Sequence, residues 1–281
     1  MIGTSRQAGT GGRGISGRLI VALIVALISI VGYFGARQVN PVTNETQNIS
    51  MTVEQEIGLG RQAAPELAAQ YGGQTQNAEL QATVERVGGA LVQQSEASAA
   101  PYPFEFHVLA DQQTINAFAL PGGQVFVTEG LLQLLETEGE LAGVLAHEIF
   151  HVVGRHSAEQ VARAQLAEGL TGAAVIAAYD PNDPSSAQSA QVALLVGQVV
   201  NMRFGREDEL ESDHEGVSYM AAAGYDPRAM VSVMQKLNQA NEGAQPPEFL
   251  STHPDPERRI ERIEEAIAAQ FPNGVPEDLK D

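Results

Sequence analysis

One short stretch in the middle of the chain has the residue types and spacing of a metal site. His147, Glu148 and His151 form the pattern HExxH. On a helix this spacing places the two histidines one turn apart on the same face, with a carboxylate beside them. Paired imidazoles of this kind are typical ligands of a catalytic zinc ion, and the carboxylate can act as general base. The alternative is a chance match on an amphipathic helix.

A catalytic zinc site needs a third protein ligand. In the pattern HExxHxxGxxH this ligand is a histidine, and Gly154 fits that pattern, but Ser157 stands where the histidine is required. His156 comes one residue early, which on a continuous helix turns its side chain by about 100°. We therefore interpret His156 as a surface or helix-end histidine.

A glutamate from a later helix is the other source of a third ligand. Glu209 and Asp213 lie one turn apart on a helical pattern that continues through Met220. Glu209 could bind the metal, while Asp213 could accept the second ring N–H of a histidine ligand and so fix its tautomer. The alternative is a solvated acidic helix face, which we prefer for the neighbouring acids. These are Glu207, Asp208 and Glu215.

Four segments in this order resemble the HtpX, BepA and CAAX-prenyl-protease type of zinc metallopeptidase, metallopeptidase family forty-eight. Residues 116–127 are similar to the strand and turn that precede the active site in that family, and 147–151 is its HExxH. Residues 206–213 are similar to its R-x-x-E-x-E-A-D pattern, with Ser212 where alanine is usual. Residues 252–260 are similar to its T-H-P segment.

The resemblance implies a fold and a set of roles. The fold is α+β and mostly α-helical: a gluzincin zinc-peptidase domain with a small sheet or hairpin beside the HExxH helix, plus an N-terminal transmembrane helix. His147, His151 and Glu209 would bind one Zn²⁺ ion, and Glu148 would be the general base. Zinc lowers the pKa of its bound water to about 7 and polarises the scissile carbonyl.

For two further residues, the resemblance suggests roles but leaves alternatives open. His253 and Arg259 are candidates for stabilising the oxyanion of the tetrahedral intermediate, because both offer hydrogen-bond donors. In some relatives a histidine of this segment approaches the zinc and restrains activity, so His253 is also a candidate regulator. The alternative for His253 is a helix N-terminal residue in a proline-rich turn.

Two strand-like runs, 115–120 and 124–128, flank a Pro-Gly-Gly turn signal and predict a hairpin. In zinc peptidases of this type an extended substrate adds to an exposed strand edge. By resemblance, the substrate-binding candidates are Asn116, Ala117, Phe118 and Ala119. An ordinary core hairpin is the alternative. A further strand is expected at 104–109, and helices at 53–71 and 80–94.

The N-terminal sequence predicts that the protein is inserted in a membrane. Arg6, Arg13 and Arg18 precede an uncharged run, 19–36, which as a helix spans about 27 Å, close to the hydrocarbon thickness of a bilayer. The positive flank predicts a single-pass protein of a bacterial-type cell membrane, with its catalytic part outside the cytoplasm. The small-x-small pattern that marks a signal-peptide cleavage site is poorly matched at the end of this run. We therefore favour an uncleaved signal-anchor; the alternative is a cleaved, secreted form.

The chain divides into five predicted regions. They are a cytoplasmic basic N-terminus (1–18), a transmembrane signal-anchor (19–36), a polar spacer (37–51), a zinc metallopeptidase domain (52–270) and a C-terminal tail (271–281). Two apolar runs, 161–178 and 192–200, are interpreted as core or as a lid over the site, because both are short and interrupted for a membrane span.

Composition limits the partners. The net charge of the 281 residues is −19, and the first 40 carry four arginines and no acid, so the rest carry −23. Nucleic acid is therefore an unsuitable partner. With no cysteine, the chain has no disulfide and no cysteine-linked lipid.

Together these features predict a membrane-tethered zinc metalloendopeptidase. By resemblance, its substrates are unfolded or misassembled polypeptides, as in envelope protein quality control. One alternative is a catalytically silent zinc-binding module that holds extended polypeptides like a chaperone. Another is a self-restrained enzyme in which the 157–200 segment or His253 covers the metal.

Overall fold

The computed structural model describes residues 17–178, 205–242, 247–253 and 259–281. The predicted run at 192–200 lies outside these ranges. The elements in chain order are α1 (Gly17–Gly35), β1 (Arg37–Val39), β2 (Thr46–Asn48), α2 (Val53–Gln70), α3 (Ala78–Gln94), η1 (Glu96–Ala99), β3 (Glu105–Leu109), β4 (Ala117–Leu120), β5 (Gln124–Thr128), α4 (Glu129–Leu134), α5 (Glu138–Val153), α6 (His156–Ala178), α8 (Gly205–Ala222), α9 (Arg228–Asn241), α10 (Phe249–Thr252) and α11 (Arg259–Gln270). The expected fold class, α+β and mostly helical, is confirmed.

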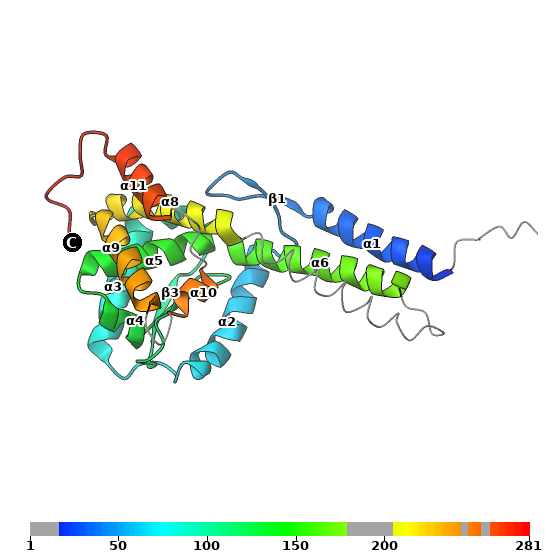
Figure 1. Cartoon of the computed structure of the whole chain (residues 1–281), viewed down its shortest axis with the longest axis horizontal. Coiled ribbons are helices and arrows are strands. Elements are labelled where there is room, and N and C mark those ends of the chain that lie inside the picture. The colour runs from blue at the N-terminus through cyan, green and yellow to red at the C-terminus, as the bar shows by residue number, and fades with distance from the viewer. Residues whose placement is uncertain (1–16, 179–204, 243–246, 254–258) are drawn as a thin grey trace, which may run out of the picture.

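Helix α5 carries the HExxH motif through the centre of the domain (Figure 1). It begins in a capping box: the Glu140 backbone N–H donates to Thr137 Oγ1 at 3.1 Å, and the Thr137 N–H donates to the Glu140 carboxylate at 3.4 Å. Every residue from Gly139 to Val153 is buried. Helices α3, α8 and α9 pack against α5, so the motif is held inside a helical core.

The sheet is three-stranded, in the order β3-β5-β4. β3 pairs with β5 in parallel and β4 pairs with β5 antiparallel, which confirms the predicted hairpin and small sheet. The hairpin turn requires glycine because Gly122 has a φ of +83° and its backbone lies against Ile57 of α2. Because β4 comes last in the strand order, it is an edge strand, and it contacts both α5 and α10.

Residues 37–49, part of the predicted polar spacer, form an ordered hairpin of β1 and β2. The Asn40 side-chain amide donates to the Val153 carbonyl at 2.7 Å, and that of Gln47 donates to the Gly154 carbonyl at 2.5 Å. The last carbonyls of a helix have no partner within the helix. The hairpin therefore caps the C-terminal end of α5.

Helices α1 and α6 pack along each other and project away from the domain (Figure 1). α1 is the one helix in the described ranges that is long and apolar enough to cross a membrane. The expectation that 161–178 is core or a lid differs from the structure, because this run continues α6 along α1 rather than into the core or over the HExxH motif. Its apolar pattern reflects helix–helix packing with α1.

An ion pair between Arg155 and Glu56 joins the turn after α5 to α2. Arg155 has a φ of +59°, is buried, and donates from Nε to Glu56 Oε1 at 3.0 Å. Its Nη1 donates to Gln38 Oε1 at 3.0 Å, and Tyr102 donates to the other Glu56 oxygen at 3.0 Å. The network fixes the turn that separates α5 from α6.

Arg155→Met is expected to lower the free energy of unfolding by about 3–5 kcal/mol, because it leaves the buried Glu56 carboxylate without its cation. In a chain of this size that corresponds to a fall in the melting temperature of roughly 10 °C. The matched control is Arg61→Met, which removes a cation from the exposed pair with Glu105 and should cost less than about 1 kcal/mol. Equal shifts in thermal unfolding would contradict the structural role of Arg155.

Candidate metal centre

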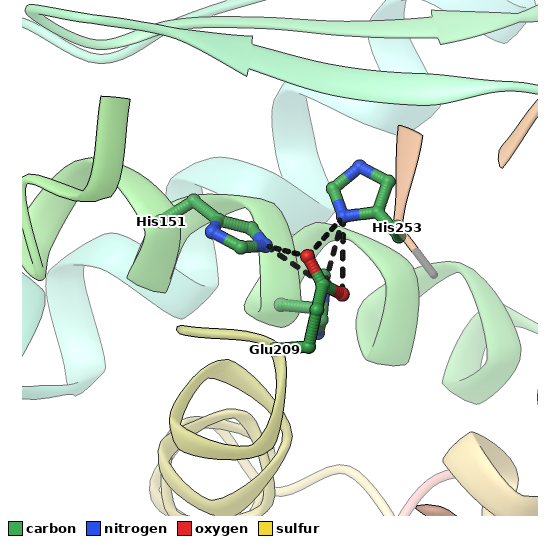
Figure 2. Close-up of side chains that lie close together, drawn as sticks. His151, Glu209 and His253 are labelled. Carbon is green, nitrogen blue, oxygen red and sulfur yellow. Dashed lines mark hydrogen bonds and ion pairs between the residues drawn. The ribbon is translucent and has the colours of Figure 1, made fainter. Parts of the chain in front are cut away.

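Four side chains from three parts of the chain converge on one point. They are His147 and His151 of α5, Glu209 of α8, and His253 just after α10, all buried and with one donor atom each within 4.8 Å of the others. Figure 2 shows His151, Glu209 and His253 pointing toward one another, with Glu209 rising from α8 below. The structure thus brings together the three predicted metal ligands and His253.

The donor atoms lie close to the separations of a tetrahedral metal shell, with two of the three distances from His147 Nε2 slightly shorter. His147 Nε2 lies 3.0 Å from His151 Nε2, 3.2 Å from Glu209 Oε2 and 3.3 Å from His253 Nδ1. A tetrahedral shell with bonds of about 2.0–2.2 Å sets its donors roughly 3.3–3.6 Å apart. Imidazole nitrogens and a carboxylate oxygen are also the donor types that zinc takes in proteins. The cluster therefore fits a divalent metal ion of this kind.

Glu148 lies beside this cluster but not in it. Its side chain is fully buried, and neither carboxylate oxygen has a hydrogen-bond partner among the residues that the structure describes. The Nε2 atom of His253 lies 3.4 Å from Glu148 Oε1. Burial raises the pKa of Glu148. A carboxylate with free lone pairs and raised basicity is suited to accept a proton.

Asp213 and Arg259 lie behind the first histidine. Asp213 Oδ1 is 2.9 Å from His147 Nδ1, as expected for the partner that fixes the tautomer of a ligand. Arg259 donates two hydrogen bonds to Asp213, from Nε to Oδ2 at 2.5 Å and from Nη2 to Oδ1 at 2.8 Å. Its Nη1 is also 3.6 Å from Glu209 Oε2. The geometry gives Arg259 a supporting place behind two predicted ligands.

Charge balance in the cluster follows from these contacts. Burial would lower the pKa of His147, but the hydrogen bonds of Asp213 and Glu209 outweigh it and raise the pKa to about 9. Burial would raise the pKa of Asp213, but the charge of Arg259 outweighs it and lowers the pKa. Because a histidine ligand must be unprotonated, a metal ion bound here would displace a proton from His147.

The structure bears out the interpretation of His156 as a helix-end histidine but contradicts its exposure at the surface. His156 begins α6, but it is buried, and its Nδ1 lies 2.8 Å from Nδ1 of His151. Its Nε2 is 3.2 Å from Glu211 Oε2. The argument from helical rotation assumed one continuous helix, whereas α5 ends at Val153 and the turn at Arg155 redirects the chain. His156 thus contacts Nδ1 of His151. The sequence analysis did not predict this contact.

The predicted substrate-binding residues lie on and beside the edge strand β4. The Asn116 and Ala117 side chains are buried, and Asn116 donates to Tyr71 at 3.3 Å. Phe118 stacks on Phe126 of β5, with ring centroids 5.0 Å apart. These side chains face the protein interior or neighbouring rings. Ala119 is partly buried and packs against the hydrophobic core.

Known proteins with similar sequences are metallopeptidases, in agreement with a metal site at this cluster. The model of Peptidase family M48 matches residues 74–267. The chain is 33% identical to the mitochondrial metalloendopeptidase OMA1 of Schizosaccharomyces pombe, over 84% of this chain and 68% of that protein. It is 30% identical to the beta-barrel assembly-enhancing protease of Yersinia pestis, over 88% of this chain and 51% of that protein.

The protease of the same name from Escherichia coli K12 is 35% identical over 59% of this chain and 35% of its own length. This chain therefore spans about half or less of these bacterial relatives. The family match covers most of the chain and includes every residue of the cluster. The chain belongs to Peptidase family M48 and is classed with its metalloendopeptidases.

Proposed function

We propose that the protein is a zinc-dependent endopeptidase that hydrolyses peptide bonds, with His147, His151 and Glu209 as ligands and Glu148 as general base. The observation that carries the proposal is the buried His/Glu cluster beside a carboxylate whose oxygens accept no hydrogen bond from the described residues. A site kept only for structure needs ligands but has no use for such a base.

The roles of the protein groups follow from their positions. When bound, a zinc ion supplies Lewis acidity, which acidifies water and polarises a carbonyl oxygen. Glu148 takes the proton of the attacking water and passes it to the leaving amine, so the peptide nitrogen departs as a neutral group. Asp213, held by Arg259, keeps His147 in the tautomer that presents Nε2 to the cluster.

His253 has two possible roles. Its ring contacts both Glu209 and Glu148, so it could donate to an oxyanion formed beside Glu148. Alternatively, its Nδ1 acts as a fourth donor and restrains the enzyme, which the 3.0 Å contact with Glu209 Oε1 favours. In that case His253 must move away before a substrate carbonyl can approach.

The edge of β4 is the proposed substrate site. Thr128 N donates to the Asn116 carbonyl at 3.0 Å. Because hydrogen-bonded pairs alternate in an antiparallel ladder, the backbone groups of Ala117 and Ala119 point to the opposite edge. No described strand pairs with that edge. An extended polypeptide could add there and lie across the cluster. Strands of the ribbon run above the cluster in Figure 2.

The membrane location is also a proposal. We infer that α1 is an uncleaved anchor in a bacterial-type membrane and that the catalytic domain, 52–270, lies outside the cytoplasm. The length and apolar character of α1 support the anchor. The bacterial relatives are named for enhancing beta-barrel assembly, which supports substrates among unfolded or misassembled envelope polypeptides.

The central test pairs metal content with proteolysis. The purified protein is expected to hold one zinc per chain by elemental analysis and to cleave an unfolded substrate such as casein. Removing the metal with a chelator should abolish cleavage, and added zinc should restore it. Casein binding without cleavage by the zinc-loaded protein would instead support the chaperone-like alternative.

A further inference from the structure

Helix α6 runs antiparallel to α1 in close contact (Figure 1). The helices approach closely at Gly169, where an added Cβ would lie 2.0 Å from Ser29 Oγ of α1. Nearer the domain, Ala162 and Leu166 of α6 line one cavity with residues of α1 and with Ala36. Small residues at a helix contact allow the close backbone approach seen between helices in membranes.

These contacts fix how deep each residue of α6 lies along α1. Because the helices are antiparallel, each step beyond Gly169 corresponds to one step back from Ser29. Ala174 is therefore level with about Ile24, and the end of α6 is level with about Ile20. Both levels lie inside the uninterrupted apolar run of α1, 19–28.

The polarity of α6 changes at the depth where α1 becomes apolar. Near the domain, Arg163 pairs with Glu159 at 3.0 Å and with Asp208 at 3.5 Å. The last charged residue of the helix is Glu168, which is exposed and level with Ile30. Residues 169–178 carry no charge, although Leu170 and Ala174 are exposed. The exposed side of this stretch therefore carries no charged side chain.

We propose that residues 169–178 of α6 lie in the hydrocarbon core of the same bilayer that α1 crosses. The proposal rests on the proposed anchor role of α1. A bilayer is the occupant that fits, because the outer faces of both helices are apolar at the same depth, and the aromatic pair Tyr33 and Phe34 on α1 lies where the interface would begin. Within a helix, all backbone groups except those of the terminal turn are hydrogen-bonded internally, as a bilayer requires.

This placement also limits where the enzyme can act. α6 starts at His156, which contacts His151, and the seven residues from there to Arg163 span only about 10 Å. The metal cluster would therefore be held close to the membrane surface. The substrate class it favours is a polypeptide segment that lies at or next to that surface.

Single-cysteine labelling tests the placement, since the natural chain has no cysteine. Three variants are compared in sealed membranes with a membrane-impermeant maleimide added to either side: Leu23→Cys in α1, Ala174→Cys deep in α6, and Gln160→Cys near the start of α6. Gln160→Cys should be labelled from one side. Leu23→Cys and Ala174→Cys should be labelled from neither side until mild detergent is added.

Casein cleavage by each variant verifies folding, and Leu170→Cys provides a second deep position. Labelling of the deep α6 cysteines in sealed membranes, with Leu23→Cys still protected, would overturn the inference and leave the anchor intact. Protection that survives mild detergent would show a covering protein instead of lipid and would also overturn it. Labelling of Leu23→Cys would overturn the anchor and the inference together, while the peptidase proposal would stand.

Discussion

Glu148→Gln is expected to lower the rate of casein cleavage by about 10²–10⁴-fold, the usual contribution of a general base. The amide has the same shape as the carboxylate but cannot accept the proton of an attacking water. Zinc content should not change, because Glu148 lies outside the four-donor cluster. Cleavage rates and elemental analysis of the same preparation separate the two effects.

Loss of folding does not explain such a result. Glu148 makes no hydrogen bond with the residues that the structure describes, and its burial already disfavours the charged form. The neutral amide should therefore leave the melting temperature unchanged or higher. Glu66→Gln, an exposed change on α2, is the matched control and should cleave casein normally. Undiminished cleavage by Glu148→Gln would remove Glu148 as the base.

Glu209→Ala is expected to weaken zinc binding by more than about 100-fold, which is the upper end of the loss caused by removing an outer hydrogen bond from a metal ligand. Glu209 contributes one oxygen near each histidine of the motif, at 3.2 Å from His147 Nε2 and 3.4 Å from His151 Nε2. Its removal leaves a cluster of imidazoles, with no carboxylate to balance the charge of the ion.

The affinity is measured by competition with a chelating dye, since His253 could retain some metal after the carboxylate is lost. Glu207→Ala is the matched control, because Glu207 lies two residues earlier on α8 and is exposed. Equal zinc affinity for Glu209→Ala and the natural protein would place the third ligand elsewhere. Cleavage should fall together with bound metal.

Local patterns were sufficient to predict most of the site. The HExxH motif lies on a helix with its own capping residues, so its two histidines face one way whatever the tertiary context. Glu209 and Asp213 are similarly related by one helical turn. The predicted helices at 53–71 and 80–94 agree with α2 and α3 to within two residues, because their apolar periodicity and caps are local signals.

The features that sequence could not predict depend on distant partners. His156 was misplaced because the left-handed backbone of Arg155 is stabilised by Glu56, about a hundred residues earlier in the chain. The order in 37–49 comes from hydrogen bonds to the end of α5. The direction of α6 comes from its packing on α1. No residue-spacing pattern within these segments encodes such contacts.

The hairpin of β1 and β2 decides where the protein can be cut for biochemical work. A shortened version that starts at α2 would lack Asn40 and Gln47, whose side chains donate to the carbonyls of Val153 and Gly154. It would thus fray the helix that bears the histidines. A version that starts at Arg37 removes α1 yet keeps both hydrogen bonds. It retains the uncharged end of α6, 169–178, and is therefore handled in detergent.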